Sequence, residues 1–345
     1  MAQETAEQRE LLIRLVEEAY DGGKAVLQPL SPYAFEDRGI YRVDWEDGTS
    51  SVLRAFLADV TVELTGHATV LDYLHRHAFT APEVTKTRNG GVLASYEGWT
   101  ALLLSFLEGE ETDFAPESLE VLGSLTGSLH RLSSDVLAET ESSSLPESRL
   151  RPTLSASEAI DHLVQVLPCV PSALSQFCED AMATLQRVQE AQQAGLLPET
   201  LLHGDCWPKN AVQQGSGGMA LIDWDCAGIG PAILEVGYLL LACHLGKPQL
   251  PAMHADSQRI AAVVHGYCQQ RKPSAVELNM LEEAVLYDVA RRVGLEKRLS
   301  TLSDEWTEDV WWQKMLARYR VGPAIATIAR RSFEQEIQSN DFQSC

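Results

Sequence analysis

The stretch that decides the fold runs from Leu202 to Asp225 and reads LHGDCWPKNAVQQGSGGMALIDWD. Two short apolar runs, 211–212 and 219–222, flank the segment 215–218, which reads GSGG. Apolar runs on either side of a glycine-rich turn are typical of a β-hairpin. We therefore expect a hairpin here, with polar side chains gathered where its strands meet the adjoining loops.

Three of those polar residues form a pattern that favours phosphoryl transfer. Asp205 and Asn210 precede the first strand, and Asp223 follows the second. Phosphoryl transfer needs a carboxylate that positions the attacking hydroxyl, together with hard oxygen ligands that hold Mg²⁺ against the phosphates. The alternative is that Asp205 and Asp223 only cap turns.

The spaced elements HGD-x4-N and IDWD-x4-GP resemble the aminoglycoside phosphotransferase and choline kinase family, which shares the protein-kinase-like fold. The resemblance implies that Asp205 is the catalytic base and that Asn210 and Asp223 are metal ligands. It also implies ATP or GTP as the phosphate donor, Mg²⁺ as the cofactor and a hydroxyl of a small molecule as the acceptor. The resemblance is specific in its residues between about Leu202 and Leu241, and over the rest of the chain it extends only to the general order of elements.

Four further residues near the motif are candidates for supporting roles. The resemblance adds His203 to the catalytic loop, where we expect it to brace the loop rather than to do chemistry. Lys209 is a candidate phosphate contact, or else a solvated loop lysine. Asp225 would orient the metal loop, meet a cationic substrate or cap a turn. Glu235 stands where the family usually has Asp, and would brace the catalytic loop from a helix N-terminus.

The fold class expected from the resemblance is α+β, with two lobes. Residues 1–108 would form a small β-rich lobe that clamps the nucleotide, and residues 109–345 a mainly helical lobe that carries the catalytic and substrate sites. Hydrophobic periodicity and turn signals give the elements of the first part. They are a helix at 5–20, strands at 39–45 and 50–56, a helix at 61–77, a strand pair at 83–87 and 91–96 around Asn89-Gly90, and a buried strand at 101–107.

The second part is expected to be mainly helical, apart from the hairpin. Residues 139–153 are rich in Ser, Glu and Pro and are typical of an exposed loop, and the last fourteen residues look polar and frayed. The expected helices are 119–132, 156–166, 174–194, 232–245, 255–271, 275–299 and 304–331.

The small lobe departs from the family pattern. Arg54, in SVLRAF, replaces the lysine that binds phosphates in kinases; it remains a cation that can contact two phosphate oxygens, or it is a solvent-facing strand residue. His67 occupies the slot of the usual helix glutamate, and Glu63 lies one turn earlier as a second possible partner. The segment Ser31–Gly39 stands in place of a glycine-rich loop although it contains a single glycine.

An adenine-binding segment is expected at the end of the buried strand. The resemblance assigns nucleotide contacts to Ser105 and Leu107 through their backbone groups, so their side chains say little about the role. Plain core packing is the alternative for Leu107.

Composition and charge exclude several classes of protein. A formal net charge of −22 argues against binding to nucleic acid or to an anionic membrane surface. An acidic surface favours a cationic acceptor, although it also simply keeps a protein soluble. The seven cysteines are scattered with no metal-ligand spacing, and no apolar run is long enough to span a bilayer, so a reducing cytoplasm is expected.

The leading interpretation is a cytoplasmic small-molecule kinase. The alternative is a degenerate kinase-like protein that binds a nucleotide or ligand without turnover, which the departures around Arg54 and His67 motivate. A protein kinase is disfavoured by His-Gly-Asp in place of His-Arg-Asp, and a nucleophilic hydrolase by the lack of G-x-S-x-G. The acceptor and the choice between ATP and GTP stay open.

Overall fold

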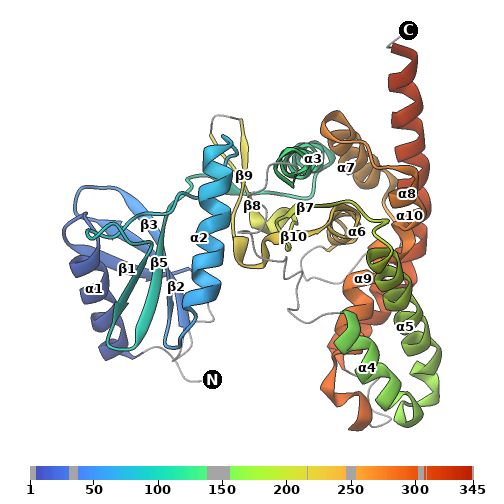
Figure 1. The fold of residues 1–345 in the computed structure, drawn as a ribbon, viewed down its shortest axis with the longest axis horizontal. Helices are drawn as coiled ribbons and strands as arrows, with labels where there is room; N and C mark the ends of the chain where they lie inside the picture. Colours follow the sequence, from blue (N-terminus) through green and yellow to red (C-terminus); the bar gives the residue numbers. More distant parts are fainter. Residues whose placement is uncertain are drawn as a thin grey trace. The chain divides into compact units, whose positions relative to one another are not determined.

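The protein is described by a computed structural model over residues 5–30, 38–137, 156–215, 217–245, 254–301, 307 and 309–343. The chain divides into two compact units, Met1–Gly109 and Glu110–Cys345 (Figure 1). The first is built around one β-sheet and the second is mainly helical, which confirms the expected α+β class. No helix in the described part is both long and apolar enough to cross a bilayer.

The first unit contains a five-stranded antiparallel sheet in the order β1-β2-β3-β5-β4. Its central strand, β3, pairs with β2 on one side and with β5 on the other. The helix before the sheet is stabilised by a capping box between Thr5 and Gln8. The elements are α1 (Ala6–Ala19), β1 (Ala25–Pro29), β2 (Arg38–Trp45), β3 (Ser50–Phe56), α2 (Thr61–Arg76), β4 (Leu93–Tyr96) and β5 (Trp99–Ser105).

The main core of this unit lies between α1 and one face of the sheet. Leu12 and Val16 of α1 are fully buried in one cluster with Leu53 and Ala55 of β3. Because side chains alternate along a strand, Arg54 points to the opposite face. It is only 5 % exposed, so the interpretation of Arg54 as a solvent-facing residue is wrong.

The strand pair expected at 83–87 and 91–96 does not form. Residue Val84 makes an isolated bridge to Leu104, and the hairpin lies instead between β4 and β5, around Glu97-Gly98. Both turn residues have positive φ, +46° and +84°, as the hairpin turn that matches strand twist requires. The segment before Asn89-Gly90 is bonded to other parts of the chain instead, since the Thr85 amide donates to the Leu103 carbonyl at 2.9 Å and the Arg88 amide to the Ala19 carbonyl at 2.8 Å.

The second unit packs helices around short strands. The predicted hairpin is confirmed as β8 and β9. Two other short strands pair with each other: β7, which precedes the segment 203–210, and β10, which follows the hairpin. The helices are α3 (Pro116–Leu137), α4 (Ala156–Val166), α5 (Ser172–Gln193), α6 (Ala232–Ala242), α7 (Ser257–Gln270), α8 (Ala275–Asn279), α9 (Leu281–Gly294) and α10 (Val310–Gln343). The strands are β6 (Glu110–Glu111), β7 (Glu199–Leu202), β8 (Ala211–Gln213), β9 (Met219–Leu221) and β10 (Gly228–Pro231).

Two helix pairs fix the geometry on which the site depends. Helix α6 crosses α9 so closely that a Cβ on Gly237 would lie 2.3 Å from the Ala284 carbonyl carbon, so this crossing requires a glycine. Helix α10 runs antiparallel to the α8–α9 segment, because Arg330 donates to the Leu278 carbonyl of α8 at 2.6 Å while Gly322, earlier on α10, lies against Leu286 of α9.

Two helix predictions in the second unit need correction. The helix expected at 275–299 breaks at Met280, and residues 297–301 form a 3₁₀ turn. The polar C-terminus is not frayed, because α10 continues to Gln343. Phe333 anchors it as a fully buried side chain whose ring lies 6.2 Å from that of Tyr267. The predictions for 31–37, 139–153 and the start of the last helix at 304–306 lie outside the described residues.

Candidate active site

The catalytic loop connects the end of β7 to the hairpin. Strand β7 ends at Leu202, which pairs with Gly228 of β10, and the loop runs from His203 to Asn210. Its last turn is a short 3₁₀ helix that begins at Pro208, whose fixed φ suits the first position of a helix. The loop is therefore held at one end by a strand pair and at the other by a helical turn.

Gly204 allows the catalytic loop to lie directly on the segment that follows Asp225. Its φ is +82°, and a Cβ at this position would lie 2.1 Å from the carbonyl oxygen of Cys226. No other residue satisfies both the backbone conformation and that close approach. Gly204 thus holds two segments together that are more than twenty residues apart in sequence.

The carboxylate of Asp205 is buried and fixed on both sides. The Tyr238 hydroxyl donates to Oδ1 at 2.7 Å, and the Asn210 side-chain amide donates to Oδ2 at 2.9 Å. Burial, followed by the charges of Asp205 and Asp288, raises the pKa of Tyr238 well above its ordinary value, so the phenol stays protonated and keeps donating. These two hydrogen bonds, one to each carboxylate oxygen, fix the orientation of the Asp205 side chain.

The orientation of Asn210 follows from its two hydrogen bonds. Its Nδ2 donates both to the Asp205 carboxylate and, at 2.9 Å, to the Asp205 backbone carbonyl. Since both partners are acceptors, the amide nitrogen must face them. The amide oxygen consequently points away from Asp205 and is the atom available to a metal ion.

His203 braces the loop through both ring nitrogens. Its Nε2 donates to the Ile222 carbonyl at 2.8 Å, and its Nδ1 accepts from the Asp205 backbone amide at 3.3 Å. Its ring centroid lies 4.5 Å from that of Trp224. With both nitrogens bonded to backbone groups, His203 connects the catalytic loop to the end of the hairpin and has no nitrogen left for a substrate.

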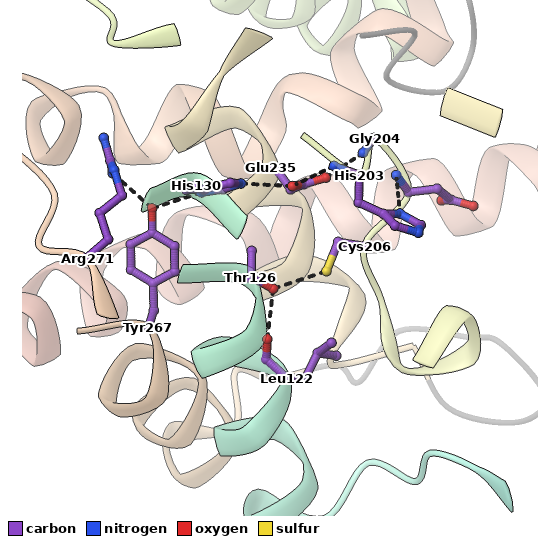
Figure 2. Close-up of polar contacts among 10 residues, drawn as sticks. Leu122, Thr126, His130, His203, Gly204, Cys206, Glu235, Tyr267 and Arg271 are labelled. Atoms are coloured by element: carbon purple, nitrogen blue, oxygen red, sulfur yellow. Dashed lines mark hydrogen bonds and ion pairs between the residues drawn. The ribbon is translucent and has the colours of Figure 1, made fainter. Parts of the chain in front are cut away.

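Glu235 holds the start of the loop from the first turn of α6 (Figure 2). Its two oxygens accept the backbone amides of Gly204, at 2.5 Å, and His203, at 3.1 Å. The Glu235 side chain is fully buried, yet its carboxylate also accepts His130 Nε2 at 2.9 Å. Burial alone would raise the pKa of Glu235, but the bond from His130 and the surrounding charges and amides hold it below its ordinary value.

A chain of buried polar groups continues from Glu235 towards α7 and α8. The Tyr267 hydroxyl lies 2.9 Å from His130 Nδ1 and accepts from Arg271 at 2.9 Å (Figure 2). Arg271 also pairs with Glu277 at 2.7 Å, and Glu277 is only 1 % exposed. We call these five residues, Glu235, His130, Tyr267, Arg271 and Glu277, the Glu235 network.

Sequence reasoning missed Tyr238 and most of the Glu235 network. Tyr238 lies three residues after Glu235, so the helical period places both on the same side of α6, and this spacing was a usable signal. Glu277 is part of a capping box with Ser274, which is also legible in the sequence. Nothing in the sequence connects Tyr267 and Arg271 to the catalytic loop, because that contact depends on how α3 packs against α7.

Asp223 follows the hairpin directly and adopts a left-handed backbone conformation, with φ +62° and ψ +59°. Its neighbour Ile222 is bonded on both sides, by its amide to the Asn210 carbonyl at 2.9 Å and by its carbonyl to His203. The backbone at Asp223 is thereby fixed next to the catalytic loop. Asp225, two residues on, is exposed.

Lys209 is directed to the neighbouring sheet edge. Its ammonium group pairs with Glu111 of β6 and lies 5.9 Å from the centroid of the Phe114 ring. These contacts occupy Lys209 with protein groups in the second unit.

The first unit holds the residues predicted to bind the nucleotide. Arg54 lies on β3 opposite Leu102 of β5, and His67 on α2 is 7 % exposed, whereas Glu63 on the first turn of α2 is exposed. Burial thus favours His67 over Glu63 as the residue on the sheet side of α2.

The end of β5 carries the two remaining candidates. Ser105 is the last residue of the strand, and its amide and hydroxyl are bonded to the backbone of Glu83, each at 2.8 Å. Leu107 lies two residues beyond the strand and is half-buried.

The described residues contain no preformed cluster of metal ligands. No group of three or more His, Cys, Asp or Glu side chains suited to a metal ion occurs there. The amide oxygen of Asn210 and the carboxylate of Asp223 are hard oxygen donors, the type of ligand that Mg²⁺ prefers.

Comparison with solved structures shows the protein-kinase-like fold. An amicoumacin kinase bound to AMP-PNP, Ca²⁺ and its antibiotic aligns with a TM-score of 0.64 and 17% identity over 93% of this chain and 95% of that one. A spectinomycin phosphotransferase bound to ADP and spectinomycin gives 0.60 and 15% over 96% and 100%. The Plasmodium vivax ethanolamine kinase gives 0.57 and 10% over 94% and 91%.

Comparison by sequence settles the family. No curated protein sequence matches the chain. A family profile described as the phosphotransferase enzyme family matches residues 34–295, which is most of the chain and confirms the resemblance carried by the HGD and IDWD motifs. The chain belongs to the phosphotransferase enzyme family.

Proposed function

We propose that this protein transfers the γ-phosphate of ATP or GTP to a hydroxyl group of a small molecule, with Mg²⁺ and with Asp205 as the catalytic base. The observation that carries the proposal is the fixed carboxylate of Asp205. It is buried, and one hydrogen bond from Tyr238 and one from Asn210 fix the orientation in which it would meet an acceptor hydroxyl. In a loose transition state such positioning matters more than early removal of the proton.

The residues present fit a divalent cation. Asn210 offers its amide oxygen because its nitrogen is used in both bonds to Asp205, and Asp223 offers a carboxylate from a backbone held in the left-handed region. Such a conformation costs about 1–3 kcal/mol in a non-glycine residue and is concentrated at functional sites. When bound, the ion offsets negative charge on the phosphates. The amicoumacin kinase and spectinomycin phosphotransferase structures contain AMP-PNP and ADP, which supports a nucleotide donor.

The roles of the supporting residues follow from their contacts. His203 and Glu235 hold the loop that carries Asp205, and Asp225 lies beside the metal ligand Asp223. In the first unit we assign the phosphates to Arg54 and the base to the backbone at Ser105 and Leu107. Lys209 is a weaker candidate for phosphate because Glu111 already pairs with it. The six cysteines in the described part are free thiols, which suits the cytoplasm, where both nucleotides are available.

The test is release of ADP or GDP from the wild type and from Asp205→Ala, with Mg²⁺ and a panel of amines, amino sugars and hydroxy acids. We expect acceptor-stimulated release that falls by about a thousandfold or more in Asp205→Ala, because both positioning and proton acceptance are lost. Asp161→Ala, which removes an exposed carboxylate of α4, serves as the control and should retain full activity.

The opposing outcome favours the degenerate binding protein. If nucleotide binds but neither an acceptor nor Mg²⁺ promotes any Asp205-dependent release, the protein is a ligand-binding member of the family without turnover. Direct measurement of nucleotide binding by titration calorimetry separates this outcome from a protein that has lost the nucleotide site altogether.

A further inference from the structure

Three arginines lie on α9 and α10, two helices that pack against α6. Arg291 and Arg292 lie in the last turn of α9, and Arg318 lies on α10. We call these three residues the arginine group. All of them belong to the second unit, which also carries Asp205, so their relation to the base does not depend on the placement of the first unit.

The crossing of α6 and α9 brings Arg292 close to Asp205. Gly237 of α6 lies against Ala284 of α9, and Tyr238 is the next residue of α6. Tyr238 donates to Asp205 at 2.7 Å, and its phenol feels the charges of both Asp288 and Arg292. Arg292 in turn feels the negative charge of Asp205. The charged groups of Asp205 and Arg292 therefore both act electrostatically on the Tyr238 hydroxyl.

The antiparallel register of α9 and α10 brings Arg318 to the same place. Gly322 lies against Leu286 of α9, and Arg330 reaches the Leu278 carbonyl of α8, which precedes α9, so α10 runs in the direction opposite to α9 with Gly322 level with Leu286. Continued by one more turn, this register puts Arg318 level with the stretch 288–292. The charges that act on Arg318 are those of Asp288 and Arg292, followed by the Tyr238 phenol, in agreement with that position.

The arginine group has fewer carboxylate partners than charges. Arg292 Nε pairs with Asp288 at 2.8 Å. Arg318 makes no hydrogen bond or ion pair with any residue that the structure describes, and its Nε is buried. Arg291 is 4 % exposed, and within the described chain its polar contact is with the face of the Tyr287 ring at 5.5 Å. Burial lowers the pKa of both Arg291 and Arg318, because it disfavours the charged form of the guanidinium group.

A buried cation without an anionic partner is unfavourable unless a ligand supplies that partner. The guanidinium group presents two parallel donors that match the two oxygens of a carboxylate. Arg292 already has Asp288 as its partner, whereas Arg318 has no such partner in the described chain, so a single carboxylate of a ligand would supply the missing one.

We propose that Arg318 and Arg292 bind a carboxylate of the acceptor and thereby place its hydroxyl at Asp205; this rests on the proposed phosphotransferase function. The acceptor is then a hydroxy acid or hydroxy amino acid. The acidic surface as a whole favours cationic ligands, but at short range in a partly buried site the nearest charges outweigh distant, screened ones. An acceptor that carries an amino group as well as the carboxylate is compatible with the acidic surface and with the arginines.

The test compares small compounds that differ by one carboxylate. Titration calorimetry with the full chain, Mg²⁺ and a non-hydrolysable ATP analogue measures the dissociation constants of ethanolamine against serine, of 1-amino-2-propanol against threonine, and of glycerol against glycerate and glycerol 3-phosphate. We expect the carboxylate to tighten binding by about tenfold to a hundredfold in at least one series, as for a hydrogen-bonded charge pair.

Variants assign that preference to the arginines. Arg318→Gln should abolish it, Arg318→Lys should restore part of it because a cation is retained, and Arg320→Gln, an exposed arginine of the same helix, should leave it unchanged. The circular dichroism spectrum of each variant checks that it is folded.

Three outcomes overturn the proposal. One is equal or absent binding of both members in every series, another is a carboxylate preference that survives in Arg318→Gln, and the third is a preference for glycerol 3-phosphate over glycerate, which would make the ligand a phosphate. Because calorimetry measures binding and needs no turnover, it tests the carboxylate site independently of the kinase reaction. Carboxylate binding that depends on Arg318, without nucleotide hydrolysis, would support the carboxylate site and contradict the proposed phosphotransferase activity. Phosphorylation of amines that lack a carboxylate, and of no hydroxy acid, would support the activity and contradict the carboxylate site.

Discussion

Two groups of charged side chains in the second unit are built in opposite ways. In the Glu235 network every charge meets its partner inside the protein: Glu235 accepts from two backbone amides and from His130, and Arg271 pairs with Glu277. In the arginine group, Arg318 has no such partner in the described chain. The first arrangement is complete without a ligand, so it stabilises the fold of the loop. The second is complete only with an anion, so it is the arrangement expected of a binding site.

The strongest test of this comparison is at Glu235, where we expect the largest loss of stability. Glu235→Ala leaves the amides of His203 and Gly204 and the His130 nitrogen without an acceptor, so the free energy of unfolding should fall by about 3–5 kcal/mol. Urea unfolding followed by circular dichroism measures it. Glu235→Asp keeps the charge and should cost less, about 1–2 kcal/mol. A loss below 1 kcal/mol for Glu235→Ala would show that the network does not support the fold.

The pH dependence of stability sharpens the same point. The folded pKa of Glu235 lies below its ordinary value of 4.5, so its stabilisation is fully present above that pH and is lost as the pH falls towards the folded pKa. The stability advantage of the wild type over Glu235→Gln should therefore be constant from pH 7 to about pH 5.5 and shrink below about pH 4.5. An advantage that grows on acidification would mean that Glu235 is protonated in the folded protein.

Tyr267 tests whether the outer part of the Glu235 network matters. Tyr267→Phe removes the hydroxyl that joins His130 to Arg271, and we expect a loss of about 1–2 kcal/mol in the free energy of unfolding. Tyr287→Phe is a suitable control on α9, because within the described chain its hydroxyl makes no hydrogen bond. Equal stability of the two variants would confine the network to Glu235 and His130.

The smallest stability effect is expected in the arginine group. Arg318→Gln removes a charge that has no partner to lose, so the melting temperature should stay the same or rise, with a change in stability of about 1 kcal/mol or less. Arg271→Gln, which removes a paired arginine of the other group, should lower it clearly. A marked destabilisation by Arg318→Gln would show that Arg318 serves the fold, and the contrast between the two groups would disappear.

The catalytic loop was legible in the sequence because its residues are close together. Asp205, Asn210 and the hairpin after them are set by local turn signals and short spacings. Tyr238 could have been found from its helical spacing to Glu235, whereas the arginine group could not, because α9 and α10 come together with α6 only through helix crossings between segments far apart along the chain. Burial of the arginines was equally hidden, since charged residues on helices usually face solvent.

The rest of the fold divides in the same way. The hairpin between β2 and β3 followed from Asp47-Gly48, whereas Asn89-Gly90 gave an equally strong signal for strands that do not pair. The polar end of α10 was expected to fray, yet one buried ring, Phe333, holds it, together with a 2.9 Å contact between Glu336 and His265. Both errors arose where a distant packing contact decided the outcome over local sequence.

The contact between Gly204 and Cys226 also limits how this enzyme can evolve. Protein kinases carry arginine at the middle position of the corresponding motif, His-Arg-Asp, and an arginine of this kind can pair with a phosphorylated residue to switch a loop on. Here a carbonyl oxygen occupies the space that any side chain would need. No single substitution can therefore introduce such a phosphate sensor into the loop. Regulation by that route would first require the segment after Asp225 to move away.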